Sequence, residues 1–204
     1  MDRRLLTILM IVFVQLVGAS MVNPILPLYA KNVFKMEPQV ITLLLTAFFA
    51  AQFIAGPFIG RLSDQHGRLP VLIISQIGTV IAFLMIALAQ SSETLFIARI
   101  LDGITGGNII VAQAYVTDIF PEEKRTQALG YIFAAFGLGF IVGPAAGGLL
   151  AGAFGPQIPF LLAAVAAFLT VLLTHFTLEE TVSLEEREQN KKVKRGELNP
   201  LNLI

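Results

Sequence analysis

The sequence contains no cysteine, no tryptophan and only two histidines among its 204 residues. Without cysteine, these residues cannot form disulfides, iron–sulfur clusters or cysteine–zinc sites, and they offer no thiol nucleophile. His66 and His175 fall at opposite ends of the predicted topology, so they do not form the start of a metal site. We therefore expect neither a metal nor a bound cofactor.

Charged residues are also scarce. Only 14% of the residues are charged, compared with about 25% in soluble domains. Another 55% are hydrophobic, and the mean hydropathy is +0.77. This excess of apolar residues excludes a soluble globular protein. Because the 14 basic and 14 acidic residues cancel, no overall field attracts nucleic acid as a partner.

The charged residues are clustered, and the stretches between clusters are long enough to cross a lipid bilayer. The gaps after Arg4, Glu37 and Arg68 contain 26, 23 and 24 uncharged residues, and a spanning helix needs about 20. A gap of 53 residues follows Arg125; Gly and Pro around Gly155 divide it into two passes. The sequence predicts six transmembrane helices: Leu5–Tyr29, Val40–Ile59, Leu69–Gln90, Thr94–Thr117, Thr126–Gly152 and Ile158–Leu178.

Lysine and arginine are concentrated on one side of these spans. Eleven lie on that side, and only Lys31 and Lys35 lie on the other. Since basic residues remain on the cytoplasmic side, both termini are expected to be cytoplasmic. Residues 1–178 would form the bundle. Residues 179–204, with 11 charges in 26 positions, would form a charged cytoplasmic linker or, on composition alone, a solvated tail.

An internal repeat relates the second predicted span to the fifth. The pattern Gly-Pro-x-x-Gly-x-Leu begins at Gly56 and again 87 residues later at Gly143. A unit of three helices has an odd number of crossings, so its second copy enters the membrane in the opposite direction. The expected fold is therefore an all-α integral membrane bundle with a 3+3 inverted repeat over about residues 5–90 and 94–178. Such repeats are typical of secondary transporters, although Gly and Pro are common enough in membrane helices to align by chance.

Two charged residues lie inside the fourth predicted span. Each isolated charge at this depth costs about 3 kcal/mol or more, so Arg99 and Asp102 require compensation. On a continuous helix Gly106, Gln113 and Thr117 share their face, and Asn108 and Tyr115 point to the opposite side. This face is interpreted as the lining of an aqueous cavity in which Asp102 accepts a proton. The alternative is an ion pair that locks helices together.

Short motifs accompany these charges. Asp64 and Arg68 are four residues apart, close enough to pair on one helical turn, and Gly67 can adopt a left-handed turn. In the fifth span the glycines permit close helix approach and Pro144 predicts a kink.

These motifs resemble those of the major facilitator superfamily. Gly60-x-Leu62-x-Asp64-x-x-Gly67-Arg68 is similar to its signature loop, Arg99-x-x-x-Gly103 to its fourth-helix motif, and Gly143-Pro144-x-x-Gly147-Gly148 to its fifth-helix antiporter motif. The chain matches the first six-helix half of a twelve-helix fold. Within the family, the antiporter motif and Asn23-Pro24-x-x-Pro27 resemble proton-coupled drug exporters of the tetracycline-efflux type.

The resemblance implies roles for particular residues. Asp64 and Arg68 would form a cytoplasmic charge network with Asp118, and Arg99 would take part in proton coupling. The residues of the fifth-helix motif would form a hinge or seal: Gly143, Pro144, Gly147 and Gly148. Gln15 stands where the tetracycline-type pattern has an aspartate in the first helix, and Asp102 is the expected substitute.

The expected function is secondary active transport: a proton-coupled antiporter that exports a small drug-like compound across the bacterial cytoplasmic membrane, driven by the proton gradient. The partners would be lipid, a small-molecule substrate and either a missing six-helix half or a second copy of the chain. Alternatives are a nutrient symporter or facilitator, and a non-transporting membrane protein. No Gly-x-Ser-x-Gly, His-Glu-x-x-His or paired intramembrane aspartates are present, so an enzyme is not expected.

Overall fold

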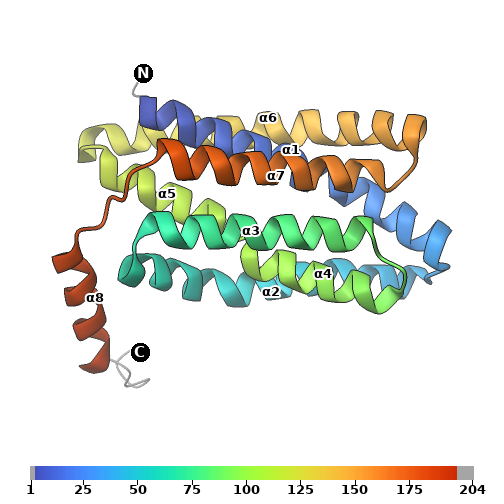
Figure 1. Cartoon of the computed structure of the whole chain (residues 1–204), viewed down its shortest axis with the longest axis horizontal. Helices are drawn as coiled ribbons and strands as arrows, with labels where there is room; N and C mark the ends of the chain where they lie inside the picture. Colours follow the sequence, from blue (N-terminus) through green and yellow to red (C-terminus); the bar gives the residue numbers. More distant parts are fainter. Residues whose placement is uncertain (1–2, 197–204) are drawn as a thin grey trace.

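The computed structural model describes residues 3–196, which form helices joined by short turns (Figure 1). Six stretches of the described chain are long and apolar enough to cross a membrane, which confirms the predicted all-helical bundle. The spans are α1 (Arg3–Phe34), α2 (Pro38–His66), α3 (Arg68–Ala87), α4 with α5 (Ser92–Ile119), α6 (Glu122–Phe154) and α7 (Ile158–Thr177).

The charged segment that follows the bundle folds into a further helix, α8 (Leu184–Gly196), at one end of the bundle (Figure 1). Residues 197–204 of the predicted linker lie outside the described residues. The helix begins with a capping box: the Ser183 hydroxyl accepts the Glu186 amide at 3.2 Å, and the Glu186 carboxylate accepts the Ser183 amide at 2.9 Å. The amide hydrogen bond lowers the pKa of Glu186.

The fourth span differs from the single helix predicted over residues 94–117, and that expectation was wrong at one point. The structure has two helices, α4 (Ser92–Thr105) and α5 (Asn108–Ile119), separated by a turn at Gly106 and Gly107. Glycine is about 1 kcal/mol less favourable than alanine inside a helix, and two in succession interrupt this one. The shared and opposite faces expected for a continuous helix therefore do not apply across the turn.

Glycines bring α1 and α6 into close contact along one stripe of α6. A Cβ atom on Gly139 would lie 2.8 Å from Leu16 Cβ, and one on Gly147 would lie 2.8 Å from Ile25 Cδ1. At Gly143, between them, a Cβ would overlap the Ser20 hydroxyl. Only the absence of a side chain permits this approach, as expected for small residues between membrane helices.

Hydrogen bonds between buried polar side chains connect α7 to α1 and to α3. Gln15 of α1 donates from Nε2 to Thr170 Oγ1 of α7 at 3.5 Å, and Gln76 of α3 donates from Nε2 to Thr174 Oγ1 at 2.9 Å. In an apolar bundle an unpaired amide is costly. These pairs therefore hold α7 against α1 and α3.

The helices differ in how much of their surface is buried by neighbouring helices. In the most apolar window of each span, 61% of α1 is buried, compared with 22% of α2 and 28% of α6. Large apolar side chains such as Phe53 of α2 and Ile141 of α6 are exposed. Faces of this kind are compatible only with lipid or with another helical unit.

The close approach of α1 and α6 predicts a position-specific effect of added methyl groups. Gly143→Ala places a methyl group against Ser20 and 2.7 Å from the Val17 carbonyl, and overpacking costs about 1–3 kcal/mol. Thermal unfolding of the purified protein should therefore occur several degrees lower. Gly137 lies on the same helix with nothing within 4 Å of its Cβ position, so Gly137→Ala should leave the midpoint unchanged or raise it. Equal effects of the two substitutions would contradict this packing.

Candidate functional site

The buried ion pair lies in α4, which packs against α2 and α3. Arg99 Nη1 donates to Asp102 Oδ2 at 2.7 Å, and the two side chains are only 1% and 6% exposed. The spacing of three residues places both groups on one face of the helix. The guanidinium carbon lies 3.9 Å from the centre of the Phe48 ring of α2, which covers the charge with an aromatic face.

Arg99 keeps unused hydrogen-bonding capacity. Its Nε and Nη2 atoms are buried and have no partner among the described residues. These two donors share one edge of the guanidinium plane, the geometry that binds paired oxygen acceptors bidentately. Buried donors without partners are costly, so this edge has the geometry and the free donors to bind an acceptor.

Helix α2 approaches α4 closely beside the ion pair because glycine occupies the facing position of α4. A Cβ atom on Gly103 would lie 2.8 Å from Ala51 Cβ, and Gln52 Nε2 donates to the Gly106 carbonyl at 3.3 Å. The sequence reasoning missed Phe48 and Gln52. Gln52 could have been noticed as a polar residue in an apolar span, whereas Phe48 gave no such indication among many phenylalanines.

The structure does not join the other predicted cavity residues to this pair by hydrogen bonds among the described residues. Gln15 is buried on α1 and bonds to Thr170. Gln113 lies on α5, half-buried and beyond the turn that follows α4. Their assignment to the proton or substrate path stays a prediction.

A second charged cluster joins α2, α3 and α5 at the end of the bundle that carries α8. Arg68 Nη1 donates to Asp64 Oδ1 at 2.6 Å and to Ser63 Oγ at 2.7 Å, while its Nε donates to Asp118 Oδ2 at 2.9 Å. Gly67 has φ +107°, a conformation that favours glycine, and ends α2 directly before Arg68. Arg68 thus contacts both acids of the predicted cytoplasmic charge network. Gly60 lies four residues before Asp64 on α2, with Ile110 3.7 Å from its Cβ position.

The segment after α7 also contributes to this cluster through Glu180, a residue that the sequence reasoning missed. Its carboxylate accepts the backbone amides of Arg68 at 2.8 Å and Leu69 at 3.2 Å, which caps the N-terminus of α3. Arg187 of α8 pairs with the same carboxylate at 3.0 Å, and Thr181 donates to Asp118 at 2.9 Å. The pair of acids Glu179 and Glu180 just after the last span was the available indication.

The residues assigned to the fifth-helix motif lie on two faces of α6. Gly143 and Gly147 are buried against α1, whereas Pro144 and Gly148 are exposed. Nothing lies within 4 Å of the Cβ position of Gly148. Helix packing therefore accounts for two of these four residues only.

Six spanning helices with a charged pair buried among them define an integral membrane protein, and intramembrane charges of this kind mark functional sites. The model of the Major Facilitator Superfamily matches residues 8–203. The chain belongs to the Major Facilitator Superfamily, as its motifs predicted. This is a family of transporters, so the exclusion of an enzyme is confirmed.

Relatives and a solved structure support the assignment. The chain is 33% identical over 194 residues to the class H tetracycline resistance protein of Pasteurella multocida, covering 94% of this chain and 48% of that protein. It is 35% identical over 179 residues to multidrug resistance protein 2 of Bacillus subtilis, covering 87% and 44%. The structure of the human organic anion transporter MFSD10 (TETRAN) superposes with a TM-score of 0.78 at 25% identity, over 91% of this chain and 49% of that one. The chain thus spans about half the length of these proteins.

The capping role of Glu180 predicts how α8 is held. In Glu180→Gln the neutral amide loses the ion pair with Arg187, and hydrogen bonds to a charged group contribute about 1.5–3 kcal/mol. Tryptic cleavage within residues 184–196 should accelerate about tenfold or more, because a loss of 1.4 kcal/mol raises the open population tenfold. Glu185→Gln, a matched exposed position on α8, should be cleaved at the wild-type rate. Equal rates for all three proteins would show that Glu180 does not hold α8.

Proposed function

We propose that the complete protein is a secondary active transporter that exports a small, drug-like compound in exchange for protons. The observation that carries the proposal is the buried Arg99–Asp102 pair with two unused guanidinium donors. A structural lock would use the donors of Arg99 fully, whereas an exchanging site needs an acceptor that can leave. The tetracycline and multidrug resistance relatives support the substrate class.

In the proposed cycle, protonation of Asp102 removes the negative charge that compensates Arg99. A lone guanidinium in this apolar setting is costly, so the neutral pair favours a state in which other acceptors or water reach Arg99. Protonation and substrate occupancy thereby bias the same equilibrium in opposite directions, which is the requirement for exchange. The proton gradient supplies the free energy, with no bound cofactor.

The cytoplasmic gate in this proposal is the Arg68 cluster. Its ion pairs connect α2, α3 and α5 at one end of the bundle, and they would break when that end opens. The basic residues at this end support a cytoplasmic location for it and for both termini, in a bacterial cell. Alternating access then consists of making and breaking this cluster as the central site exchanges its ligand.

A second six-helix unit would complete the transporter by covering α2 and α6, whose apolar faces are the least buried. The relatives, about twice as long, support this partner. Sequencing the genomic DNA beyond codon 204 tests it. We expect a reading frame or an adjacent gene that encodes six further spans. A stop codon without such a gene would overturn this arrangement and favour a pair of identical chains.

The role of Asp102 can be tested in inverted membrane vesicles that contain the protein expressed from its complete gene. Asp102→Asn should reduce proton-gradient-driven tetracycline uptake by about 10²-fold, the usual scale for a lost proton-transfer group. Counterflow of labelled against unlabelled tetracycline should persist, because it needs no net proton movement. Glu93→Gln, at the exposed start of the same helix, is the matched control. Gradient-driven uptake that survives in Asp102→Asn would remove Asp102 from the mechanism.

A further inference from the structure

Phe48 lies between Arg99 and the surface of the described bundle. Helix α2 presents Leu44, Phe48 and Gln52 at intervals of four residues, so their side chains share one face of the helix. Leu44 is fully buried on that face. Phe48 is half-buried, and its ring lies against the guanidinium. An acceptor that approaches Arg99 from the α2 side therefore meets the Phe48 ring first.

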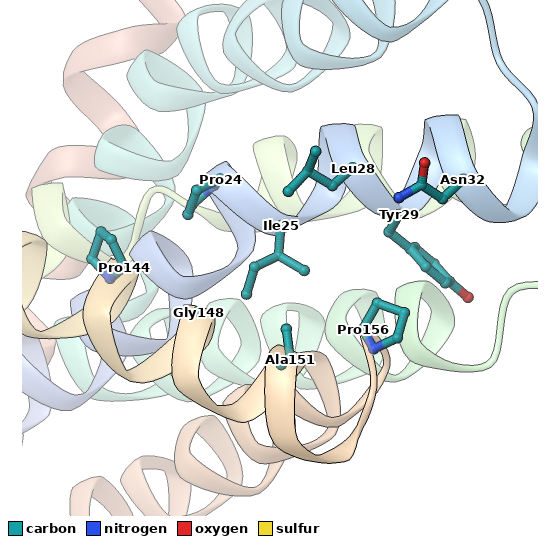
Figure 2. A pocket seen from close by; sticks show the side chains of 10 residues that line it. Pro24, Ile25, Leu28, Tyr29, Asn32, Pro144, Gly148, Ala151 and Pro156 are labelled. Carbon is teal, nitrogen blue, oxygen red and sulfur yellow. The ribbon is translucent and has the colours of Figure 1, made fainter.

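The pocket between α1 and α6 offers no other route to the guanidinium. Its volume is about 410 Å³, and Figure 2 shows it between Pro24 and Leu28 of α1 and Gly148 and Ala151 of α6. None of the described residues that line it belongs to α2 or α4. This α1–α6 pocket is therefore separate from the Arg99 site.

The backbone of α2 is held against α4 on both sides of the Phe48 ring. A Cβ atom on Gly103 would overlap the Phe48 carbonyl oxygen and would lie 3.2 Å from the Gln52 amide nitrogen. One turn farther along α2, the Gln52 side chain donates to the Gly106 carbonyl, and one turn earlier Leu44 is buried. The two helices cannot separate at Phe48 without losing these contacts. Rotation of the Phe48 side chain between its staggered rotamers needs no such loss.

The ring compensates the charge of Arg99 without satisfying its hydrogen bonds. An aromatic face attracts a cation that lies over it, but it offers no lone pair in the plane of the guanidinium, where the N–H bonds of Nε and Nη2 point. Both atoms lack a partner among the described residues while the ring is in place. The acceptor for this edge has to come from a group that enters the site.

We propose that the Phe48 side chain is a lid over Arg99. It turns away from the guanidinium to admit an acceptor with two adjacent oxygen atoms, such as a carboxylate, and it returns when that acceptor leaves. The proposal rests on the exchange at Arg99 proposed above. Phe48 donates no hydrogen bond and carries no proton in this scheme; it determines when Arg99 can be reached.

Access to Arg99 can be measured with phenylglyoxal, a reagent that reacts with guanidinium groups, in membrane vesicles that contain the complete protein. Residues 69–124 contain one arginine, Arg99, and end at their one lysine, Lys124. Modification of Arg99 therefore leaves this peptide uncut by trypsin, and mass spectrometry of the digest gives the modification rate. Modification of Arg68 in the same digest is the internal control.

Removal of the ring should open the site. Phe48→Ala should raise the rate of Arg99 modification about tenfold or more, because the cation–π contact that covers the guanidinium is lost. Phe48→Tyr keeps a ring at this position and should react at the wild-type rate. Phe53→Ala, on the same helix where the native side chain is 84% exposed, should also leave Arg99 unchanged. Arg68 should react equally in all four proteins.

Each other result overturns the lid. Wild-type reactivity of Arg99 in Phe48→Ala, including no reaction in either protein, would show that the ring is not what shields the guanidinium. Acceleration at Arg68 as well would indicate a general loosening of the fold. Equal acceleration in Phe48→Tyr and Phe48→Ala would show that the aromatic ring is not the cover.

The class of acceptor is tested in the same variant with benzoate, a planar carboxylate. At tenfold excess over its dissociation constant, benzoate should slow the modification of Arg99 in Phe48→Ala about tenfold, without affecting Arg68. Benzamide at the same concentration, with one oxygen and no charge, should give no protection. Equal effects of the two compounds, or no saturable protection by benzoate, would contradict an acceptor with paired oxygens.

Failure of the lid and failure of the proposed function give different results. Unchanged labelling in Phe48→Ala, together with loss of gradient-driven uptake in Asp102→Asn, would remove the lid and retain the exchange. The predicted labelling in Phe48→Ala, together with full uptake in Asp102→Asn, would retain the lid and remove the proposed exchange.

Discussion

The absence of water inside a lipid bilayer is the constraint on which this structure depends. Arg99 carries its charge into the bundle, and every nearby feature reduces the cost: Asp102 pairs with it, and the ring of Phe48 covers it. Gly103 lets α2 approach closely enough for that ring to reach the guanidinium. The cost of burying Arg99 is nevertheless not fully offset, because its Nε and Nη2 donors remain without partners among the described residues. A bundle selected only for stability would gain from replacing this pair with apolar residues, so its presence argues for exchange.

Three features lie at different depths of the same bundle. The Arg68 cluster lies at the end of the bundle that carries α8 (Figure 1), and the Arg99–Asp102 pair lies within α4. The α1–α6 pocket, lined by residues such as Ile25 and Gly148, lies toward the other end. Helix α6 has two different faces: the glycines on one face pack tightly against α1, and nothing lies near the Cβ positions of Gly148 and Gly152 on the adjacent face. The segment after α7 completes the closed end, where Glu180 caps α3 and Thr181 reaches Asp118. In the proposed cycle, the Arg68 cluster would act as the gate and the Arg99–Asp102 pair as the charged centre.

Much of the fold could be predicted because charge spacing and hydrophobic length report directly on membrane spans. The gaps after Arg4 and Glu37 located α1 and α2, although the helices end at Phe34 and His66, beyond the predicted ends at Tyr29 and Ile59. The turn at Gly106 could not be predicted with equal security, since glycine pairs also occur within continuous membrane helices. At the sites, Arg99 and Asp102 were evident because they are the charges inside an apolar span. Phe48, Glu180 and the α1–α6 pocket depend on contacts between distant segments, which local patterns do not encode, and the split of the α6 glycines between two faces needed three-dimensional packing.

The proposed exchange depends on Asp102 giving up a proton as substrate binds. The most direct test is the number of protons released when tetracycline is added to the purified complete protein in weakly buffered solution, measured with a pH indicator. Linkage between the two ligands predicts release of about one proton per tetracycline bound to the protonated wild type, and no release from Asp102→Asn at comparable occupancy. Binding without proton release in the wild type, or unchanged release in the variant, would contradict the account.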